Sequence, residues 1–79
     1  MFNQLTINYE LPSESRVSLK VYNLFGQEVA TLVEGIQEAG YKAVEWNPST
    51  SLGQVPSGVY FYRLHAGSFF ETKKLVLLK

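Results

Sequence analysis

The sequence predicts an all-β domain, an antiparallel β-sandwich of about six to seven strands that spans residues 1–79 as one unit. Segments rich in branched and aromatic residues recur at intervals of roughly 8–12 residues, with Gly, Pro and Asn between them. No segment with helical periodicity is long enough to connect two parallel strands. Hydrophobic residues make up 46% of the chain, which is enough for a packed core.

Two strands near the N-terminus are predicted from strict alternation of apolar and polar residues. Residues 5–11 form the first, because a period of two is typical of a half-buried strand, and Pro12 ends it, since proline cannot donate to a sheet. After a loop, residues 16–22 form the second strand. The side chains expected to face the core are Leu5, Ile7, Tyr9, Leu11, Val17, Leu19 and Val21.

A turn and a less regular strand come next. Residues 23–26 begin with Asn and end with Gly, which is typical of a turn. Residues 27–33 are predicted as a short third strand whose inward candidates, Val29 and Leu32, lie three positions apart. A β-bulge or the end of the strand near residues 30–31 would explain the slipped alternation, and a helical turn is the alternative.

A connection and a fourth strand follow. Residues 34–40 are expected to form the connection, because glycines bound it at Gly35 and Gly40. Residues 41–46 form the fourth strand, and a polar loop at 49–55 leads onward. The inward side chains of this strand are expected to be Val44 and Trp46, with Lys42 at the rim.

A hairpin near the C-terminus has the strongest strand chemistry. Residues 56–64 are aromatic and branched, and a turn at 66–68 joins them to a last strand that is predicted to run to Lys79. Gly67 followed by Ser68 suits a two-residue type II′ turn. This turn sets a register with Tyr60 opposite Leu75, Tyr62 opposite Lys73, and Val59 opposite Val76. One face then carries Tyr60, Tyr62, Leu64, Leu75 and Leu77, and the other carries Val59, Phe61, Arg63, Lys74, Val76 and Leu78.

The second of these faces contains a predicted apolar contact patch. Its members are Val59, Phe61, Val76 and Leu78. A contiguous apolar patch on a single domain usually marks a contact surface. The alternative is that a loop or a preceding domain covers it.

Composition argues against catalysis and against metal or cofactor binding. The chain has no cysteine, no aspartate and one histidine, His65. Neither a thiolate zinc site nor an oxygen-rich calcium site is therefore expected. No spacing of Ser, His and Glu fits a nucleophilic or acid–base site. The sequence predicts no catalytic residue, no metal ligand and no cofactor.

Charge and hydropathy limit the partners. Seven basic and seven acidic residues give a net charge of zero, so no nucleic-acid partner is expected. No apolar run approaches the ~20 residues of a membrane span. The first residues lack the features of a signal peptide, so we expect an exported protein to carry its signal in a larger parent chain. Exposed strand edges and the apolar patch predict that the isolated domain can form a homodimer.

The aromatic residues Trp46, Tyr41, Tyr60 and Tyr62 allow two interpretations. They could form a platform on which sugars stack, or Trp46, Tyr60 and Tyr62 could belong to the core. The core is favoured, because a sandwich without disulfides needs large buried side chains. A buried Tyr60 or Tyr62 would then need a hydrogen-bond partner for its hydroxyl.

The order of several motifs resembles a known family. The motifs are Asn8–Pro12, Val17–Val29, Gly40–Trp46, Pro56–Leu64 and Thr72–Lys79. Together they resemble the type A C-terminal sorting domain of cargo proteins of the type IX secretion system. They are also similar to the immunoglobulin-like domain of the flagellar hook-capping protein. The resemblance implies an immunoglobulin-like sandwich.

The resemblance also implies a function. A sorting domain is a non-catalytic tag that the secretion translocon and a sortase read, and an upstream cargo domain precedes it. The cargo crosses the periplasm and reaches the cell surface or the medium. The alternative is a structural or carbohydrate-binding accessory module of a multidomain extracellular protein. The recognition residues that the resemblance implies are Pro56, Gly58, Tyr60, Lys74, Leu75, Val76, Leu77, Leu78 and Lys79.

Overall fold

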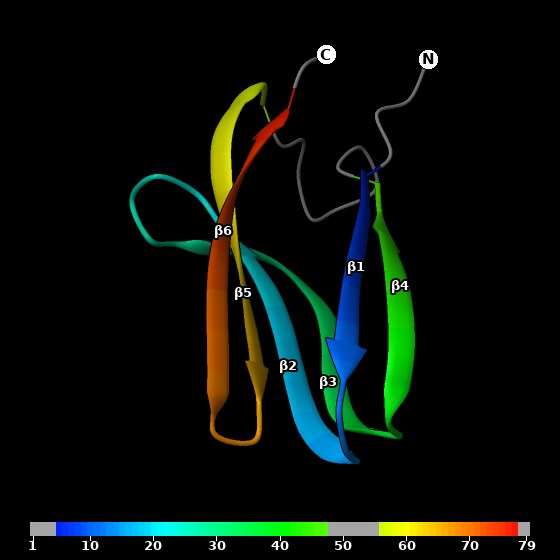
Figure 1. Cartoon of the computed structure of the whole chain (residues 1–79). Coiled ribbons are helices and arrows are strands. Elements are labelled where there is room, and N and C mark those ends of the chain that lie inside the picture. Colours follow the sequence, from blue (N-terminus) through cyan, green and yellow to red (C-terminus); the bar gives the residue numbers. More distant parts are fainter. Residues whose placement is uncertain (1–4, 48–55, 78–79) are drawn as a thin grey trace.

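The computed structural model describes residues 5–47 and 56–77, and these form six strands in two antiparallel sheets (Figure 1). The predicted all-β, immunoglobulin-like sandwich is therefore confirmed. The strands are β1 (Leu5–Leu11), β2 (Ser15–Tyr22), β3 (Glu28–Gln37), β4 (Gly40–Trp46), β5 (Gly58–Ala66) and β6 (Phe69–Leu77).

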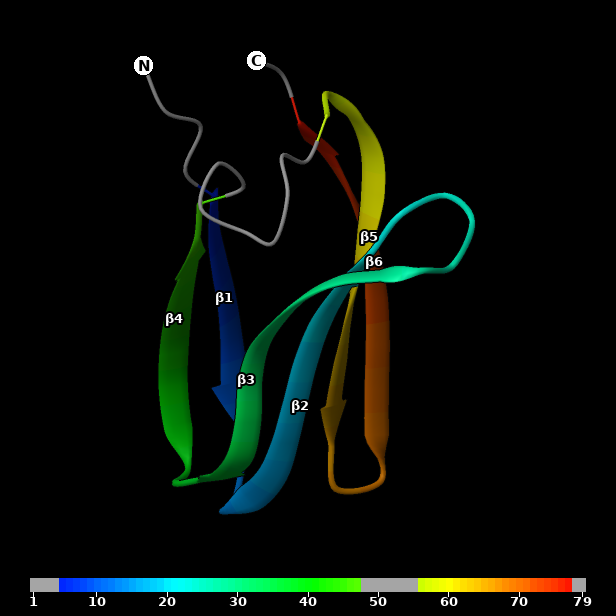
Figure 2. The same ribbon diagram turned by 180° about the vertical axis from the view of Figure 1, so that it is seen from behind.

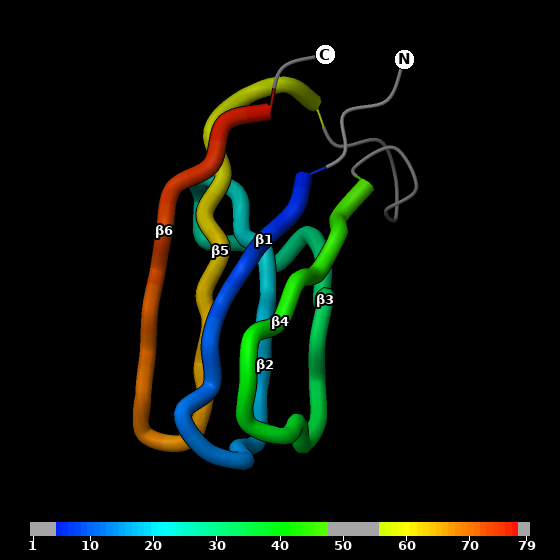
Figure 3. Tube along the Cα trace, turned by 45° about the vertical axis from the view of Figure 1, so that its right-hand side comes forward, coloured from blue at the N-terminus to red at the C-terminus, as the bar shows by residue number. Residues whose placement is uncertain are grey.

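The two sheets differ in size. The small sheet pairs β1 with β4, and the large sheet has the strand order β3-β2-β5-β6. The tube view shows β1 and β4 lying in front of β2 and β3 (Figure 3). Each sheet turns an apolar face toward the other, and packing these two faces together removes both from water. The small sheet does not cover the outer face of the large sheet.

Alternation in β1 and β2 carries the apolar residues into the core, as predicted. Val17, Leu19 and Val21 on β2 have no exposed surface. Their side chains anchor two clusters of buried residues. One contains Ile7, Tyr9, Leu11, Val17, Leu19, Leu64 and Ala66, and the other contains Val21, Trp46, Tyr60 and Leu77.

β3 is irregular near residues 30–31, where the sequence predicts a bulge or a strand end. Its register against β2 shifts twice, and each shift leaves one β3 residue, Leu32 or Val29, without a partner on β2. Such a bulge sets two residues against one, so Leu32 and Val33, and again Val29 and Ala30, pack against the core. The two bulges flank the predicted position at residues 30–31. The other two possibilities, a strand end at this point and a helical turn, are wrong, because β3 continues to Gln37.

The predicted connection at residues 34–40 is also wrong. β3 continues to Gln37 and β4 begins at Gly40, so only residues 38–39 lie between the two sheets. Gly35 and Gly40 pair within strands and have φ angles of 144° and 129°. Residues with a side chain rarely adopt such angles. These glycines therefore allow the backbone to bend where the chain passes from one sheet to the other, and they lie within strands, not at the ends of a loop.

The hairpin of β5 and β6 has the predicted register. Tyr60 lies opposite Leu75, Tyr62 opposite Lys73, and Val59 opposite Val76. Gly67 has a φ of 60°, and none of the described non-glycine residues has a positive φ. This pattern fits a type II′ turn, in which only the first central residue has positive φ. The turn closes the lower end of the hairpin (Figure 2).

Trp46 and Tyr60 belong to the core, which decides between the two interpretations of the aromatic residues. Their side chains are 3% and 5% exposed, and the rings meet edge to face with centroids 6.4 Å apart. The Tyr60 hydroxyl donates to the carbonyl of Pro56 at 2.6 Å, as a buried phenol requires. Tyr41 is 84% exposed and lies apart from them.

Candidate contact surface

Three members of the predicted apolar patch lie together on the outer face of the hairpin. Val59 and Val76 are direct partners across β5 and β6, and Phe61 lies two pairs further along, opposite Lys74. Val76 is 50% exposed, while Val59 and Phe61 are half-buried. Leu78 lies outside the described residues. The type II′ turn accounts for this grouping, because it fixes which residues share a face.

The recognition residues implied by the resemblance fall on both sides of the hairpin. Tyr60 and Leu77 are buried and Leu75 is half-buried, so their side chains support the core. Lys74, Val76 and Pro56 are exposed, and Gly58 pairs with Leu77 at the start of β5. Lys79, like Leu78, lies outside the described residues. Among the described members, a receptor could reach mainly Pro56, Lys74 and Val76.

The loop between β2 and β3 presents two further apolar side chains. Leu24 is 65% exposed and Phe25 is 88% exposed. The Asn23 side chain holds the loop in shape, because its oxygen accepts from the amides of Phe25 and Gln27 at 2.9 and 3.0 Å. A backbone bond from Gly26 to the Asn23 carbonyl adds to this. These bonds hold the backbone at Phe25 in place, and the side chain extends into solvent.

The sequence reasoning missed Leu24 and Phe25, because it treated residues 23–26 only as a turn. The available signal was an apolar pair between Asn and Gly, where turns are normally polar. The loop projects beyond the sandwich beside the hairpin (Figures 1 and 2). A hollow of about 740 Å³ lies between this loop and the beginning of β5, and Phe25 and Val59 are among its lining residues. We call Leu24, Phe25, Val59 and Val76 the outer apolar surface.

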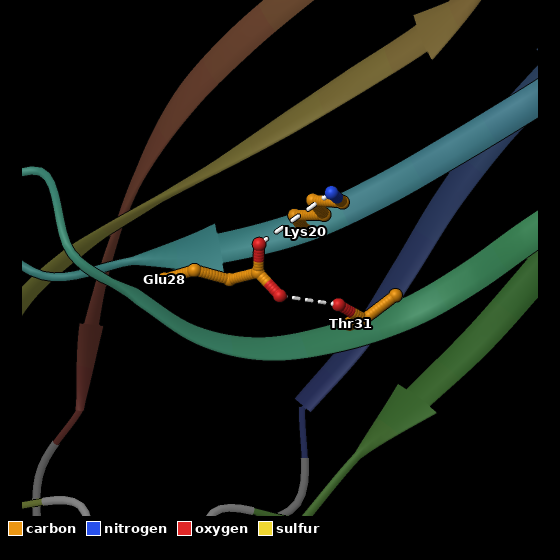
Figure 4. A network of polar contacts seen from close by, with 3 residues as sticks. All are labelled: Lys20, Glu28 and Thr31. Atoms are coloured by element: carbon orange, nitrogen blue, oxygen red, sulfur yellow. Dashed lines mark hydrogen bonds and ion pairs between the residues drawn. The ribbon is translucent and has the colours of Figure 1, made fainter.

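A polar contact ties the base of this loop to the sheet (Figure 4). The Glu28 carboxylate accepts from the Thr31 hydroxyl at 2.6 Å and lies 3.5 Å from the Lys20 ammonium. The hydrogen bond from Thr31, and then the charge of Lys20, lower the pKa of Glu28. Glu28 and Thr31 are exposed and Lys20 is half-buried, so the contact orients the start of β3 more than it stabilises the fold.

The described residues offer little chemistry beyond contact. None of them forms a cluster of three or more His, Cys, Asp or Glu side chains that could hold a metal ion. His65 stacks on Phe70 with ring centroids 4.0 Å apart, and its Nε2 lies 2.8 Å from the carbonyl oxygen of Gly67. In the described part of the chain, no helix has the length and apolarity needed to cross a membrane.

Comparison with known proteins places this sandwich in a family. Residues 3–68 match the family model described as FlgD Ig-like domain. β6 lies beyond the matched residues. Searches of the curated proteins and of the solved structures each found no match. The family represents a non-catalytic fold class. Because the match covers most of the 79 residues, the chain belongs to the FlgD Ig-like domain family.

Proposed function

We propose that this domain is a non-catalytic accessory module that docks onto a neighbouring domain of the same polypeptide in an extracellular protein. The observation that carries the proposal is the outer apolar surface. Leu24, Phe25 and Val76 are exposed and Val59 is half-buried, although both core clusters are complete without these four side chains. Exposed apolar groups gathered on one side of a domain are typical of contact surfaces.

The geometry of the loop favours a binding role for Phe25. Aromatic side chains contribute strongly to interfaces, because they bury much surface for little lost conformational freedom. The hydrogen bonds of Asn23 already fix the loop, so docking would cost little additional ordering. A neighbouring domain is the favoured partner, since such a domain stays at high effective concentration.

Hydroxyl-radical footprinting of the full-length parent protein and of the isolated chain tests this docking. We expect labelling of Phe25 to fall severalfold in the parent, because a docked domain excludes water from the outer apolar surface. Tyr41 on β4 is 84% exposed, close to the 88% of Phe25. It serves as the internal control, and its labelling should be the same in both proteins. Equal labelling of Phe25 in both proteins would contradict the proposed docking.

A second candidate function is the C-terminal sorting signal of type IX secretion. The observation that favours it is the position of β6 at the edge of the large sheet. An edge strand can accept a strand from a receptor, and Lys74 and Val76 are exposed along it. The translocon and a sortase would then be the partners, and the parent would pass through the periplasm to the cell surface.

A reporter with a cleavable signal peptide, fused upstream of this chain, tests the sorting function in a host with the type IX system. Sorting predicts surface delivery that is lost when residues 75–79 are deleted. That deletion also removes the buried Leu77 and so damages the fold. The double variant Lys74→Glu, Val76→Glu is the sharper probe, because both side chains are exposed. A reporter that stays in the periplasm with the unaltered chain would rule out sorting.

A further inference from the structure

Three cationic side chains gather at the centre of the outer face of the large sheet. Lys20 on β2 lies directly opposite Arg63 on β5, and Lys74 on β6 is a diagonal neighbour of Arg63, since it pairs with Phe61. Like charges directly opposite one another are unfavourable in a sheet. This arrangement would be relieved by an anion bound between the strands.

Two of the three cations have no acidic partner among the residues that the structure describes. Lys20 is paired with Glu28, but neither Arg63 nor Lys74 forms an ion pair with a carboxylate of the described residues. The Arg63 guanidinium lies over the ring of Phe70, 5.8 Å from the centroid, and Phe70 in turn stacks on His65. Aromatic contacts therefore position a guanidinium whose hydrogen-bonding groups remain available for a ligand.

A hollow of about 320 Å³ lies beside this guanidinium. On the sheet side it is lined by Tyr22, Phe61, Arg63 and Thr72, and the loop between β2 and β3 forms its other wall. The larger hollow, which Phe25 and Val59 line, is its neighbour, because Asn23 and Leu24 line both hollows. Arg63, Phe61 and Thr72 line only the smaller one. The volume is at the small end of the roughly 300–1,000 Å³ of ligand sites.

We propose that this smaller hollow binds an acidic sugar residue of a polysaccharide. Arg63 would receive the carboxylate in a two-pronged hydrogen bond, and Lys74 would add positive potential. Tyr22 and Phe61 would contact the apolar face of the sugar ring, and the Thr72 hydroxyl would bond to a sugar hydroxyl. An acidic side chain of a peptide would use the guanidinium but leave the two aromatic rings uncovered. The proposal goes beyond docking onto a neighbouring domain and does not depend on it.

Titration of the isotope-labelled 79-residue chain with a hexamer of galacturonic acid, followed by NMR, tests this site. We expect chemical-shift changes at Phe61, Arg63 and Thr72. The fully methyl-esterified hexamer, which keeps the rings but has no charge, is expected to bind about tenfold more weakly or worse, because charge-assisted hydrogen bonds are lost. Hexaglutamate supplies the charge without the rings and is likewise expected to bind more weakly.

Two charge variants show whether binding depends on this face. Arg63→Gln is expected to weaken binding of the galacturonic acid hexamer about tenfold or more, and its far-ultraviolet circular dichroism should be unchanged, because Arg63 is exposed. Lys73→Gln is the matched control on the opposite face of β6, and it should bind as the unaltered chain does. Equal binding of the methyl ester, equal or tighter binding of hexaglutamate, or no shift changes at all would overturn the proposal.

Discussion

Trp46→Ala is expected to destabilise the domain by about 3–5 kcal/mol, which is typical of removing a fully buried large aromatic side chain. Trp46 is 3% exposed and packs edge to face against Tyr60 in the second core cluster. A domain of this size has a free energy of unfolding of only about 4–12 kcal/mol. The variant should therefore be marginally folded or unfolded at 25 °C. Urea unfolding followed by circular dichroism measures the change.

Tyr41→Ala is the control for this variant, because Tyr41 is on the same strand but 84% exposed. Its effect on the free energy of unfolding should stay within about 0.5 kcal/mol. If the two variants lost similar stability, Trp46 would not be part of the core, and the sugar-platform interpretation would have to be reconsidered.

Local pattern was sufficient to predict most strands. β1 and β2 were predictable because strict alternation specifies both the strand and its buried face. The register of β5 against β6 was predictable because Gly67 and Ser68 select one turn type. In each case the determining information lies within a few residues of the element that it specifies.

β3 could not be delimited in the same way. Its two bulges break the period of two, and Gly35 lies inside the strand with a positive φ. A glycine within a broken pattern favours a connection when only the sequence is considered. The pairing of β3 with β2 supplies hydrogen bonds that override this local preference.

The functional surfaces were only partly predictable. Val59, Phe61 and Val76 could be grouped because one local turn brings them together. Phe25 is brought near Val59, and Lys20 near Arg63, by contacts between strands that are far apart in the sequence. The pairing of β2 with β5 is not specified by any local turn. The cluster of Lys20, Arg63 and Lys74 could therefore be recognised only from the structure.

A large difference in reactivity is expected between thiols placed at two adjacent positions of β5. Leu64 is 2% exposed and packs in the first core cluster, whereas Arg63 is exposed on the outer face. A thiol at position 64 can react only when the domain opens. Even an opening cost of about 3 kcal/mol would slow its labelling roughly 100-fold. A shift of the strand by one residue would exchange the two faces.

Thiol labelling of Leu64→Cys and Arg63→Cys therefore tests most directly whether the sandwich closes over one face of β5 and leaves the other accessible. The chain has no cysteine of its own, so each variant carries a single thiol that a chromogenic disulfide reagent reports under native conditions. We predict that Arg63→Cys reacts at the rate of a free thiol and that Leu64→Cys reacts about 100-fold more slowly until urea is added. Equal native rates, or faster labelling of Leu64→Cys, would contradict this arrangement of the two sheets.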